Sequence, residues 1–358
     1  MSGVRCMIMR GGSSKGVFFL AKDLPSDPTE RDLLLLSIMG SPDDRQIDGI
    51  GGAHPLTSKV AVVSASTADN ADVDYLFLQV SVDEALVSDR QNCGNLLAAV
   101  GPFAVERGLV TLAGAEGSDV EAHLRIRMIN TDSIATATFA LLDGRPLYKG
   151  DTAISGVPGT AAQIRLDFED IAGSSTGALL PTGNVRDVIA GIACTLVDNG
   201  MPVVVMRADA LGVTGYESCE ALENNAALRS TLEAVRIEAG RLMNLGDVTD
   251  TTVPKLTMVA APQAGGDLCT RTFIPHRCHD AIGVLGAVSV GTAALLPGTP
   301  ASDLLAGKPT GSVVLEHPTG TFEAAVEIRV EDGEITVEQA GIIRTARKLM
   351  DGEVFPRP

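Results

Sequence analysis

The sequence predicts an α+β fold. Two observations lead to this prediction: short β-type segments alternate with few helices, and the two halves of the chain share an ordered pattern. The chain has 358 residues, of which 45% are hydrophobic, so it can form more than one hydrophobic core. It contains 38 Gly and 18 Pro but no Trp, a composition typical of many turns. We therefore expect two domains, residues 1–184 and 185–358.

The first half is predicted to consist of strands interrupted by two helices. Apolar runs bounded by Gly, Asp, Asn or Ser are typical of strands. Such runs lie at residues 4–9, 17–20, 59–64, 73–82, 120–128 and 134–142. One helix is expected over 28–39, with Asp27 as its N-cap. A second should run from about Asn92 to Arg107, because Gly108 is a C-terminal signal.

A stretch rich in turn-forming residues, 173–184, separates the halves and places the domain boundary. The second half repeats the mixture of strands and helices. Strands are expected at 192–197, 202–206, 255–260 and 269–273, and helices at about 217–243 and 280–296. The final strand of the chain is free to return to the first domain.

The halves resemble each other in one respect. In the first half, Lys59 leads an apolar strand, and Cys93 later opens a helix of small residues. In the second half, Lys255 leads a strand, and Cys278 opens another such helix. Two related domains that face each other would bring both Cys-led helix ends to one central cleft.

Composition excludes several classes of partner. The formal net charge of −17 repels phosphate backbones and anionic membranes, and Lys and Arg are dispersed, so we expect no nucleic acid and no membrane. Residues 1–16 lack signal-peptide features, and the longest apolar run is too short to span a bilayer. Six cysteines without a CxxC pair predict reduced thiols. A cytoplasmic protein is expected, and the sequence leaves open whether it forms a homo-oligomer.

Residues 91–95, Gln-Asn-Cys-Gly-Asn, open the second predicted helix. The N–H groups and partial positive charge of a helix N-terminus can hold a carboxylate, and Gly94 allows close approach, with Asn92 and Asn95 beside it. The same field favours the thiolate of Cys93, which can act as acid, base or nucleophile. The alternative is a cysteine that only packs in a capping turn.

Lys59 stands at the head of an apolar strand, so its ammonium is expected near a sheet end with an apolar flank. Desolvation favours the neutral amine, which can remove a proton next to a carbonyl or carboxylate. The alternative is an edge-strand lysine whose ammonium reaches solvent. For Lys255 we expect only this structural role, an edge-strand lysine whose ammonium reaches solvent.

Residues 10–16, Arg-Gly-Gly-Ser-Ser-Lys-Gly, superficially look like a phosphate loop, but the spacing is wrong and a strand follows. A nucleotide site is therefore not expected. Arg10, with the hydroxyls of Ser13 and Ser14 and nearby N–H groups, is better suited to carboxylates, which a guanidinium pairs with bidentately. A glycine-rich hairpin turn without a binding role is the alternative.

The second half adds further candidates. Arg271 could be a second carboxylate clamp, and His276 and Cys278 follow it closely. The segment 276–279, His-Arg-Cys-His, has zinc-ligand types but no fourth ligand at recognisable spacing, so no metal is expected. Thr182 and Asn184, at the domain junction, could line a cleft between domains, where ligand sites are common.

Taken together, six motifs resemble those of the methylaconitate isomerase (PrpF) family. They are Arg-Gly-Gly-Ser-Ser-Lys-Gly at 10–16, Gln-Ile-Asp-Gly-Ile-Gly-Gly at 46–52, Leu-Thr-Ser-Lys at 56–59, Gln-Asn-Cys-Gly-Asn at 91–95, Leu-Pro-Thr-Gly-Asn at 180–184 and Asn-Leu-Gly-Asp at 244–247. The resemblance implies a diaminopimelate-epimerase-like fold. In this fold two similar α+β domains each wrap a sheet around a central helix, and the active site lies in the cleft between them.

Within the family, residues 73–77, 198–203 and 273–279 look most like the 4-oxalomesaconate tautomerase and Δ-isomerase branch of aromatic-acid catabolism. The resemblance implies an isomerase that needs no cofactor and moves a proton on a small polycarboxylate. It makes Lys59 the principal acid/base, with Cys93 facing it across the substrate. The alternatives are a 2-methylaconitate or methylitaconate isomerase, a racemase that pairs Cys93 with Cys278, and a small-acid-binding protein without turnover.

Overall fold

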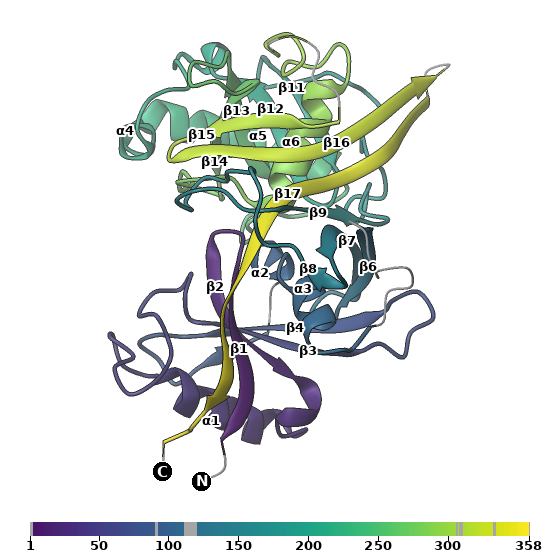
Figure 1. Ribbon diagram of the computed structural model, residues 1–358. Helices are drawn as coiled ribbons and strands as arrows, with labels where there is room; N and C mark the ends of the chain where they lie inside the picture. The colour runs from purple at the N-terminus through teal and green to yellow at the C-terminus, as the bar shows by residue number, and fades with distance from the viewer. Residues whose placement is uncertain are drawn as a thin grey trace. The chain divides into compact units, whose positions relative to one another are not determined.

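The computed structural model describes residues 3–89, 92–110, 120–305, 307, 311–331 and 334–357. The chain forms two compact units (Figure 1). Unit 1 comprises Met1–Glu169 together with Ile343–Pro358, and unit 2 comprises Asp170–Ile342. The sequence places a boundary after residue 184, and the chain changes unit after Glu169 and again after Ile342.

Unit 1 is built mainly of strands. Its elements are β1 (Val4–Gly11), β2 (Ser14–Leu20), η1 (Ala21–Asp23), α1 (Pro28–Met39), β3 (Lys59–Ala65), β4 (Val73–Val80), β5 (Val87–Ser88), α2 (Gly94–Leu97), α3 (Val100–Glu106), β6 (Val120–Met128), β7 (Ser133–Leu142), β8 (Arg145–Pro146) and β9 (Gln163–Phe168).

Unit 2 has the same mixed character. Its elements are β10 (Asp187–Ile189), β11 (Ile192–Asp198), β12 (Pro202–Arg207), η2 (Asp209–Leu211), α4 (Cys219–Asn224), α5 (Ala226–Leu242), β13 (Lys255–Ala260), β14 (Leu268–Phe273), α6 (Val284–Leu295), β15 (Val313–His317) and β16 (Gly320–Glu331). The long strand β17 (Glu334–Val354) pairs first with β16 and then, after Ile342, with β1.

The order of strand pairings repeats between the units. In unit 1, β1–β2 is antiparallel, β2–β3 parallel, β3–β4 antiparallel, β4–β6 parallel and β6–β7 antiparallel. In unit 2, the pairs β11–β12, β12–β13, β13–β14, β14–β15 and β15–β16 follow the same alternation. The strands β3 and β13 hold the same place in this order and begin at Lys59 and Lys255. The structure thus contains the repeat that the two lysine-led strands predict.

Helices cover both faces of the strands in unit 1. The face that carries Val60 and Val62 packs on α1 through Leu35 and Ile38. On the other side, Phe18 of β2 lies 5.4 Å, between ring centres, from Phe103 of α3. Because side chains alternate along a strand, Lys59 points away from α1, toward this second face.

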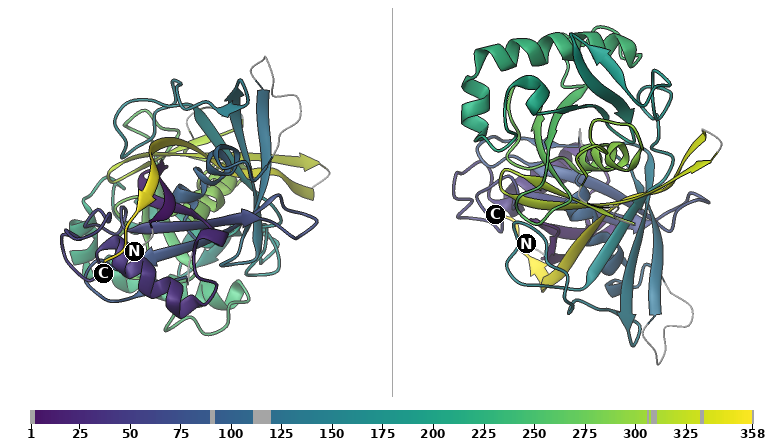
Figure 2. Two further views of the ribbon diagram at one scale, coloured as in Figure 1. Left: turned by 60° about the horizontal axis from the view of Figure 1, so that its bottom comes forward. Right: turned by 90° about the horizontal axis from the view of Figure 1, so that it is seen from above.

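In unit 2, α4 and α5 pack on the face that carries Cys194, Leu196, Val204 and Met206. Figure 2 (right) shows α5, in green, along one side of these strands. The helix α6 packs against β11, β12, β15 and β16, and its residues from Gly286 to Ala294 are buried. A buried helix beside a sheet agrees with the predicted α+β architecture.

Three predicted helices differ from the observed ones. The helix expected from Asn92 is split into α2 and α3, because Pro102 has no N–H to bond the carbonyl of Ala98. The helix expected over 217–243 is split where Asn225 caps α5, its side chain accepting from Leu228 N. The helix expected from residue 280 begins later, at Val284.

The helix α1 is predicted correctly, including its cap. Asp27 Oδ1 accepts a 3.0 Å hydrogen bond from Glu30 N, and Gly40 ends the helix at φ 82°. No residue ranges are predicted from the sequence for the strands β15, β16 and β17, although a final strand is expected. Exposed charged residues alternate with apolar ones along β16 and β17, so no continuous apolar run marks them.

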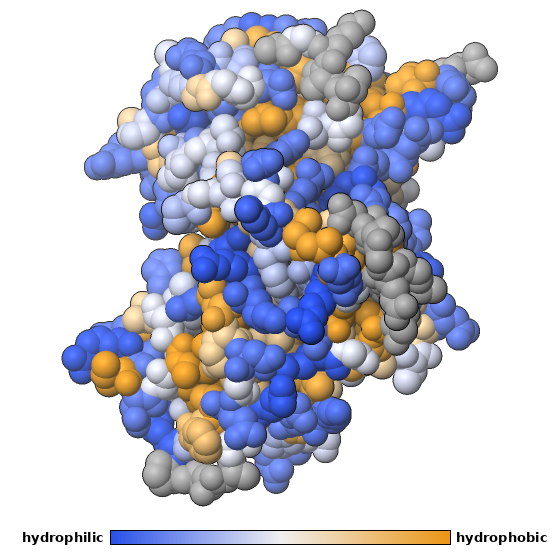
Figure 3. Space-filling view, viewed as in Figure 1, coloured by the Kyte–Doolittle hydropathy of each residue, from blue (hydrophilic) through white to orange (hydrophobic). Residues whose placement is uncertain are grey.

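No helix in the described part of the chain has the length and apolar character of a membrane span. The face shown in Figure 3 is mostly hydrophilic, and its hydrophobic residues form small separate patches. This distribution agrees with the high net charge of the chain.

Candidate active site

Lys59 is the first residue of β3 and is 7% exposed. Its Nζ donates a 2.7 Å hydrogen bond to Gln79 Oε1. The ammonium also lies 5.0 Å from the centre of the Phe77 ring, within the range of a cation–π interaction. The predicted strand-head lysine with an apolar flank is therefore present, and two specific side chains hold its charged end.

The partners of Lys59 come from the neighbouring strand. Lys59 is directly opposite Gln79 in the antiparallel β3–β4 pair, and Tyr75, Phe77 and Gln79 alternate along β4 on that same face. Gln79 is itself held, because its Nε2 donates to the carbonyl of Ser58 at 2.8 Å. The sheet register thus positions both the lysine and its acceptor.

The hairpin of β1 and β2 packs directly on the residues that follow Cys93. A Cβ at Gly11 would lie 2.6 Å from Asn95 O, and a Cβ at Gly12 would overlap Asn95 Oδ1. A Cβ at Gly16 would lie 2.8 Å from Lys59 O and 2.9 Å from Leu96 Cδ1. The glycines of this loop allow a close approach of backbones, and they bring the hairpin, Lys59 and the start of α2 together.

Asn95 joins two parts of unit 1. Its Nδ2 donates to Ser13 Oγ at 3.3 Å, and its Oδ1 accepts from Arg344 Nε at 3.0 Å.

Arg10 makes its hydrogen bonds through Nη1, to the carbonyls of Gly12 and Thr345 and to Thr345 Oγ1. Burial, and then the charge of Arg347, lower the pKa of Arg10.

Three buried polar atoms in unit 1 have no hydrogen-bond partner among the described residues: Ser14 Oγ, Asn92 Oδ1 and Tyr75 OH. The other end of the Asn92 amide donates to Thr131 Oγ1 at 2.6 Å. Buried polar atoms are nearly always paired, so unpaired ones mark places where a ligand or water can bind. Ser14 and Asn92 belong to the predicted carboxylate-binding segments.

Cys93 precedes α2, is partly exposed and makes no side-chain capping bond. With Gly94 it starts a helix of only four residues, so the field expected from a long helix is reduced. Gln91 lies outside the described residues.

The other cysteines are Cys6, Cys194, Cys269 and Cys278, which are buried, and Cys219, which is partly exposed. Burial raises the pKa of each buried thiol, and Cys93 is thus one of two accessible thiols.

In unit 2, the structure places Thr182 and Asn184 in one turn. Thr182 Oγ1 donates to Asp187 Oδ2 at 2.7 Å, and Asn184 Nδ2 donates to Asp187 Oδ1 at 2.9 Å. Asn184 N also donates to Thr182 Oγ1 at 3.3 Å. These bonds give both residues a role in shaping the turn before β10.

Arg271 lies in the middle of β14 and is 6% exposed. Its Nε donates to Glu217 O at 3.2 Å and its Nη1 to Thr270 O at 2.8 Å. Its guanidinium also lies 5.6 Å from the centre of the Tyr216 ring. The predicted clamp is thus a buried cation bonded to carbonyl groups of its own unit.

His276 and Cys278 are close in sequence but differ in environment. His276 is exposed, and its Nδ1 lies 3.7 Å from Glu233 Oε2. Cys278 is buried and forms a β-bridge with Phe273, so it does not open α6 as the sequence predicted. Burial, and then the neighbouring Cys219, raise the pKa of Cys278, so its thiol stays protonated.

Lys255 corresponds to Lys59 in the repeated strand order but differs in its contacts. A Cβ at Gly283, the N-cap of α6, would lie 3.4 Å from Lys255 Nζ. Burial lowers the pKa of Lys255. The second lysine is thus also partly desolvated, at the start of the buried helix of its unit.

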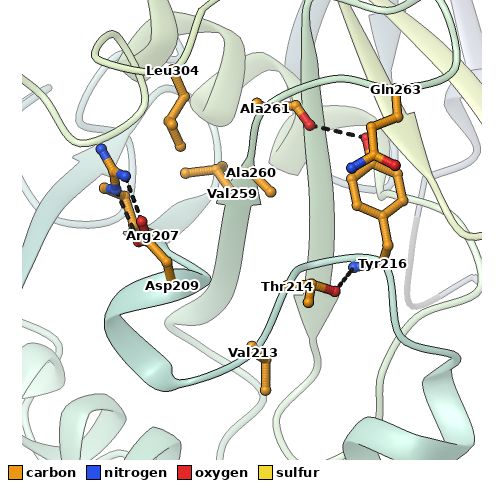
Figure 4. A pocket seen from close by; sticks show the side chains of 10 residues that line it. All are labelled: Arg207, Asp209, Val213, Thr214, Tyr216, Val259, Ala260, Ala261, Gln263 and Leu304. Carbon is orange, nitrogen blue, oxygen red and sulfur yellow. Dashed lines mark hydrogen bonds and ion pairs between the residues drawn. The ribbon is translucent and has the colours of Figure 1, made fainter.

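Unit 2 contains a cavity of about 280 Å³ outside the predicted site (Figure 4). Its lining includes Val213, Val259 and Leu304, with Tyr216 at one side and the Arg207–Asp209 ion pair at the other. None of the predicted site residues lines it. In the described ranges, no three His, Cys, Asp or Glu side chains gather as a metal site would require.

Sequence analysis missed three residues around Lys59 and Asn95. Gln79 could have been found, because a polar residue on the Phe77 face of a predicted strand is unusual. Phe77 lies within the strand predicted over 73–82, but which residue it faces depends on sheet register. Arg344 had no sequence signal, since it is far along the chain from Asn95.

The chain is similar to one protein family over nearly its whole length. The family model described as PrpF protein matches residues 1–357. This chain belongs to the PrpF family. It is 56% identical to the (4E)-oxalomesaconate Δ-isomerase of Novosphingobium sp. (strain KA1), covering 99% of this chain and 98% of that one. It is 55% identical to the 4-oxalomesaconate tautomerase of Pseudomonas putida (strain KT2440), covering 98% and 95%.

Solved structures confirm the predicted fold of this PrpF-family chain. A methylitaconate Δ-isomerase superposes with a TM-score of 0.86 at 36% identity, covering 99% of this chain and 95% of that one. A hydroxyproline epimerase from Agrobacterium vitis superposes with a TM-score of 0.51 at 12% identity, covering 99% and 93%. The second likeness concerns the fold alone, which is the epimerase-like fold.

Proposed function

We propose that this chain is an isomerase that transfers a proton on 4-oxalomesaconate, by keto-enol tautomerisation or by a 1,3-allylic shift of the double bond. Support comes from the two relatives of 55–56% identity that carry these activities in their names. In the structure, the observation that carries the proposal is Lys59, a buried strand-head lysine held by Gln79 over Phe77. The setting that the resemblance implies is aromatic-acid catabolism in the cytoplasm.

Lys59 is the base in this proposal. As the neutral amine, it removes a proton from the carbon allylic to the double bond and becomes an ammonium. The electron pair left on carbon delocalises through the double bond onto the conjugated carbonyl or carboxyl oxygen, giving a dienolate. Gln79 and Phe77 stabilise the ammonium that forms, through the hydrogen bond and the cation–π contact described above.

The second half of the reaction returns a proton at a different atom. We assign this delivery to the thiol of Cys93, which is partly exposed and lies beside the hairpin and α2. Donation to carbon completes the allylic shift, and donation to oxygen completes the conversion to the enol. Lys59 and Cys93 then exchange protons with solvent to restore the starting enzyme.

Carboxylate binding is assigned to polar groups of unit 1, with one further candidate in unit 2. Ser14 Oγ is buried without a partner and can donate to a carboxylate oxygen. Among the described residues Arg10 uses only Nη1, which leaves the donors on Nη2 and Nε for a substrate carboxylate. Arg271 likewise retains Nη2 and stays a candidate clamp in unit 2. Backbone N–H groups near Gly94 complete this set.

One assay panel tests the proposal. The purified protein is mixed in deuterated water with 4-oxalomesaconate, 2-methylaconitate or methylitaconate, and ultraviolet absorbance and proton NMR are followed. We expect rapid isomerisation and deuterium incorporation with 4-oxalomesaconate and much slower change with the others. Faster turnover of either other acid would overturn the substrate assignment, and binding without deuterium exchange would favour a small-acid-binding protein.

A racemase that pairs Cys93 with Cys278 is disfavoured by one observation. In a racemase of this kind each thiol must reach the substrate and act as the base in one direction, whereas Cys278 is buried in a β-bridge with Phe273, and burial and then the neighbouring Cys219 raise its pKa. Deuterium entry at the α-carbon of an amino acid would reverse this conclusion.

A further inference from the structure

The segment 46–52, Gln-Ile-Asp-Gly-Ile-Gly-Gly, is one of the motifs by which the chain resembles the PrpF family, but it has no part in the proposed reaction. Its first residue, Gln46, is 1% exposed and has a left-handed backbone conformation, with φ 45°. A left-handed residue other than glycine is strained, and a buried amide destabilises the fold unless it is hydrogen-bonded. The bonds that this amide makes must therefore offset both effects.

The amide of Gln46 bonds three segments of unit 1. Its Nε2 donates to Ser41 Oγ at 3.0 Å and to Ser58 Oγ at 2.7 Å, so both of its N–H groups are used. Its Oε1 accepts from Ala53 N at 2.8 Å. One side chain thus connects the end of α1, the middle of the following loop and the residue directly before Lys59.

The glycines of the motif allow the loop to close around this amide. A Cβ at Gly51 would overlap Gln46 Oε1, and a Cβ at Gly49 would overlap the backbone of Met39 at the end of α1. Gly51 N also donates to Met39 O at 3.1 Å. The spacing of the glycines after Gln46 therefore follows from two close contacts, one with the amide and one with α1.

Ser58 connects this amide to the lysine. Its Oγ accepts from Gln46, and its carbonyl accepts from Gln79 Nε2 at 2.8 Å. The carbonyl of Pro55, in the same loop, accepts from Gln79 Nε2 at 3.1 Å. Because two carbonyls bond the nitrogen of the Gln79 amide, its oxygen is the atom that faces Lys59 Nζ, at 2.7 Å.

We propose that Gln46 is a positioning residue for Lys59, acting through Ser58 and Gln79. It holds the loop 46–58 in the conformation that orients the Gln79 amide toward the ammonium. The inference rests on the proposed function for the role of Lys59 as the base. Gln46 and Ser58 are 1% and 0% exposed, so they do not contact a substrate, and any effect on the reaction passes through their neighbours.

The test compares the two hydroxyls that this amide bonds. Ser58→Ala removes the acceptor beside Lys59. Ser41→Ala is the matched control, because it removes the acceptor on the far side, which also donates to Ser81 O at 2.6 Å. The values of kcat and KM for 4-oxalomesaconate are measured in both variants, in Gln46→Met and in the double variant of Gln46→Met with Ser58→Ala.

We expect Ser58→Ala and Gln46→Met each to lower kcat by about tenfold or more, with KM nearly unchanged. The double variant should lose no more than the larger single loss, because the two residues act as a unit. Ser41→Ala should keep the parent kcat. If Gln46→Met does not fold, the two serine variants decide the question.

A role in stability alone predicts a different order. Ser41→Ala loses the hydrogen bonds to Gln46 and Ser81, so it should then lower kcat at least as much as Ser58→Ala. This result would overturn the proposal, and so would a change confined to KM or losses that simply add in the double variant.

A second reading needs no substrate. Trace acetic anhydride acetylates Lys59 and the exposed Lys22 in the same molecule, and mass spectrometry gives the ratio of the two products. Release of the Gln79 amide should raise this ratio about threefold or more in Ser58→Ala, the effect of losing one hydrogen bond, and leave it unchanged in Ser41→Ala. An unchanged ratio in Ser58→Ala would contradict the proposal. If the ratio rises but the parent does not isomerise 4-oxalomesaconate, the proposed function fails and the positioning of Lys59 stands.

Discussion

Lys59 Nζ donates to Gln79 Oε1 at 2.7 Å, and the two residues are directly opposite each other in the β3–β4 pair. The amide is held in turn by the carbonyls of Ser58 and Pro55. A neutral acceptor fixed by the sheet thus holds the ammonium without adding a negative charge. In the proposed reaction, this acceptor bonds the ammonium that forms when Lys59 takes the substrate proton.

Gln79→Glu should move the activity profile to higher pH. A carboxylate beside Lys59 stabilises the ammonium, so the neutral amine appears only in more alkaline solution. We expect activity at neutral pH to fall by about tenfold for each unit of this displacement. The measurement is the pH at which kcat/KM rises. Gln79→Met is the uncharged control, and in this variant that pH should not increase. If the pH of the rise is unchanged in Gln79→Glu, this lysine does not control the rate.

Cys93→Ser should lower turnover of 4-oxalomesaconate by about 100-fold or more, the usual contribution of a general acid. The hydroxyl preserves size but donates a proton far less readily than a thiol. Cys219→Ser is the control, since that thiol is also partly exposed but has no part in the proposed reaction. A loss of only a few fold in Cys93→Ser would reduce the thiol to a positioning group.

Gly12→Ala should destabilise the protein more than Gly108→Ala. Both glycines have positive φ, 51° and 66°, so both variants suffer the left-handed strain of about 1–2 kcal/mol. A Cβ at Gly12 would also overlap Asn95 Oδ1, whereas a Cβ at Gly108 meets nothing within 4 Å. Urea unfolding should therefore show an extra loss of about 1–3 kcal/mol for Gly12→Ala. Equal losses would mean that the hairpin does not pack on Asn95 as described.

Lys255→Met should be more stable than the parent at neutral pH, and the difference should shrink as pH rises. Burial lowers the pKa of Lys255, so the folded state disfavours its proton while the unfolded chain keeps it up to about pH 10.4. The parent therefore gains stability as pH rises through the lowered folded pKa toward that of the unfolded chain. Free energies of unfolding at pH 7 and pH 10 measure this gap, with exposed Lys22→Met as the control. A difference in free energy of unfolding between the variant and the parent that grows with pH would contradict this prediction.

The sequence predicts the parts of the fold that local patterns encode. Asp27 and Gly40 bracket α1 because capping is local, and Lys59 could be singled out because an apolar run follows it. The breaks at Ala98 and Asn225 were missed, since apolar periodicity continues across them. Overall α+β class and the repeat followed from element order alone.

Contacts between distant segments could not be predicted in the same way. Arg344 reaches Asn95 from β17, and Gln79 meets Lys59 only because of the β3–β4 register. Thr182 and Asn184 have the residue types of a binding loop, yet Asp187 accepts from both. Such pairings depend on which distant segments the fold brings together. Local sequence patterns do not encode this.

The central claim is that Lys59 removes the substrate proton, and Lys59→Met tests it most directly. Methionine keeps the length and apolar stem of the side chain but cannot accept a proton. The measurement is deuterium exchange from solvent into 4-oxalomesaconate, with Lys22→Met as the control lysine. The account predicts that Lys59→Met folds and binds the substrate but loses exchange and turnover by about 1,000-fold or more. Exchange at the parent rate would contradict it.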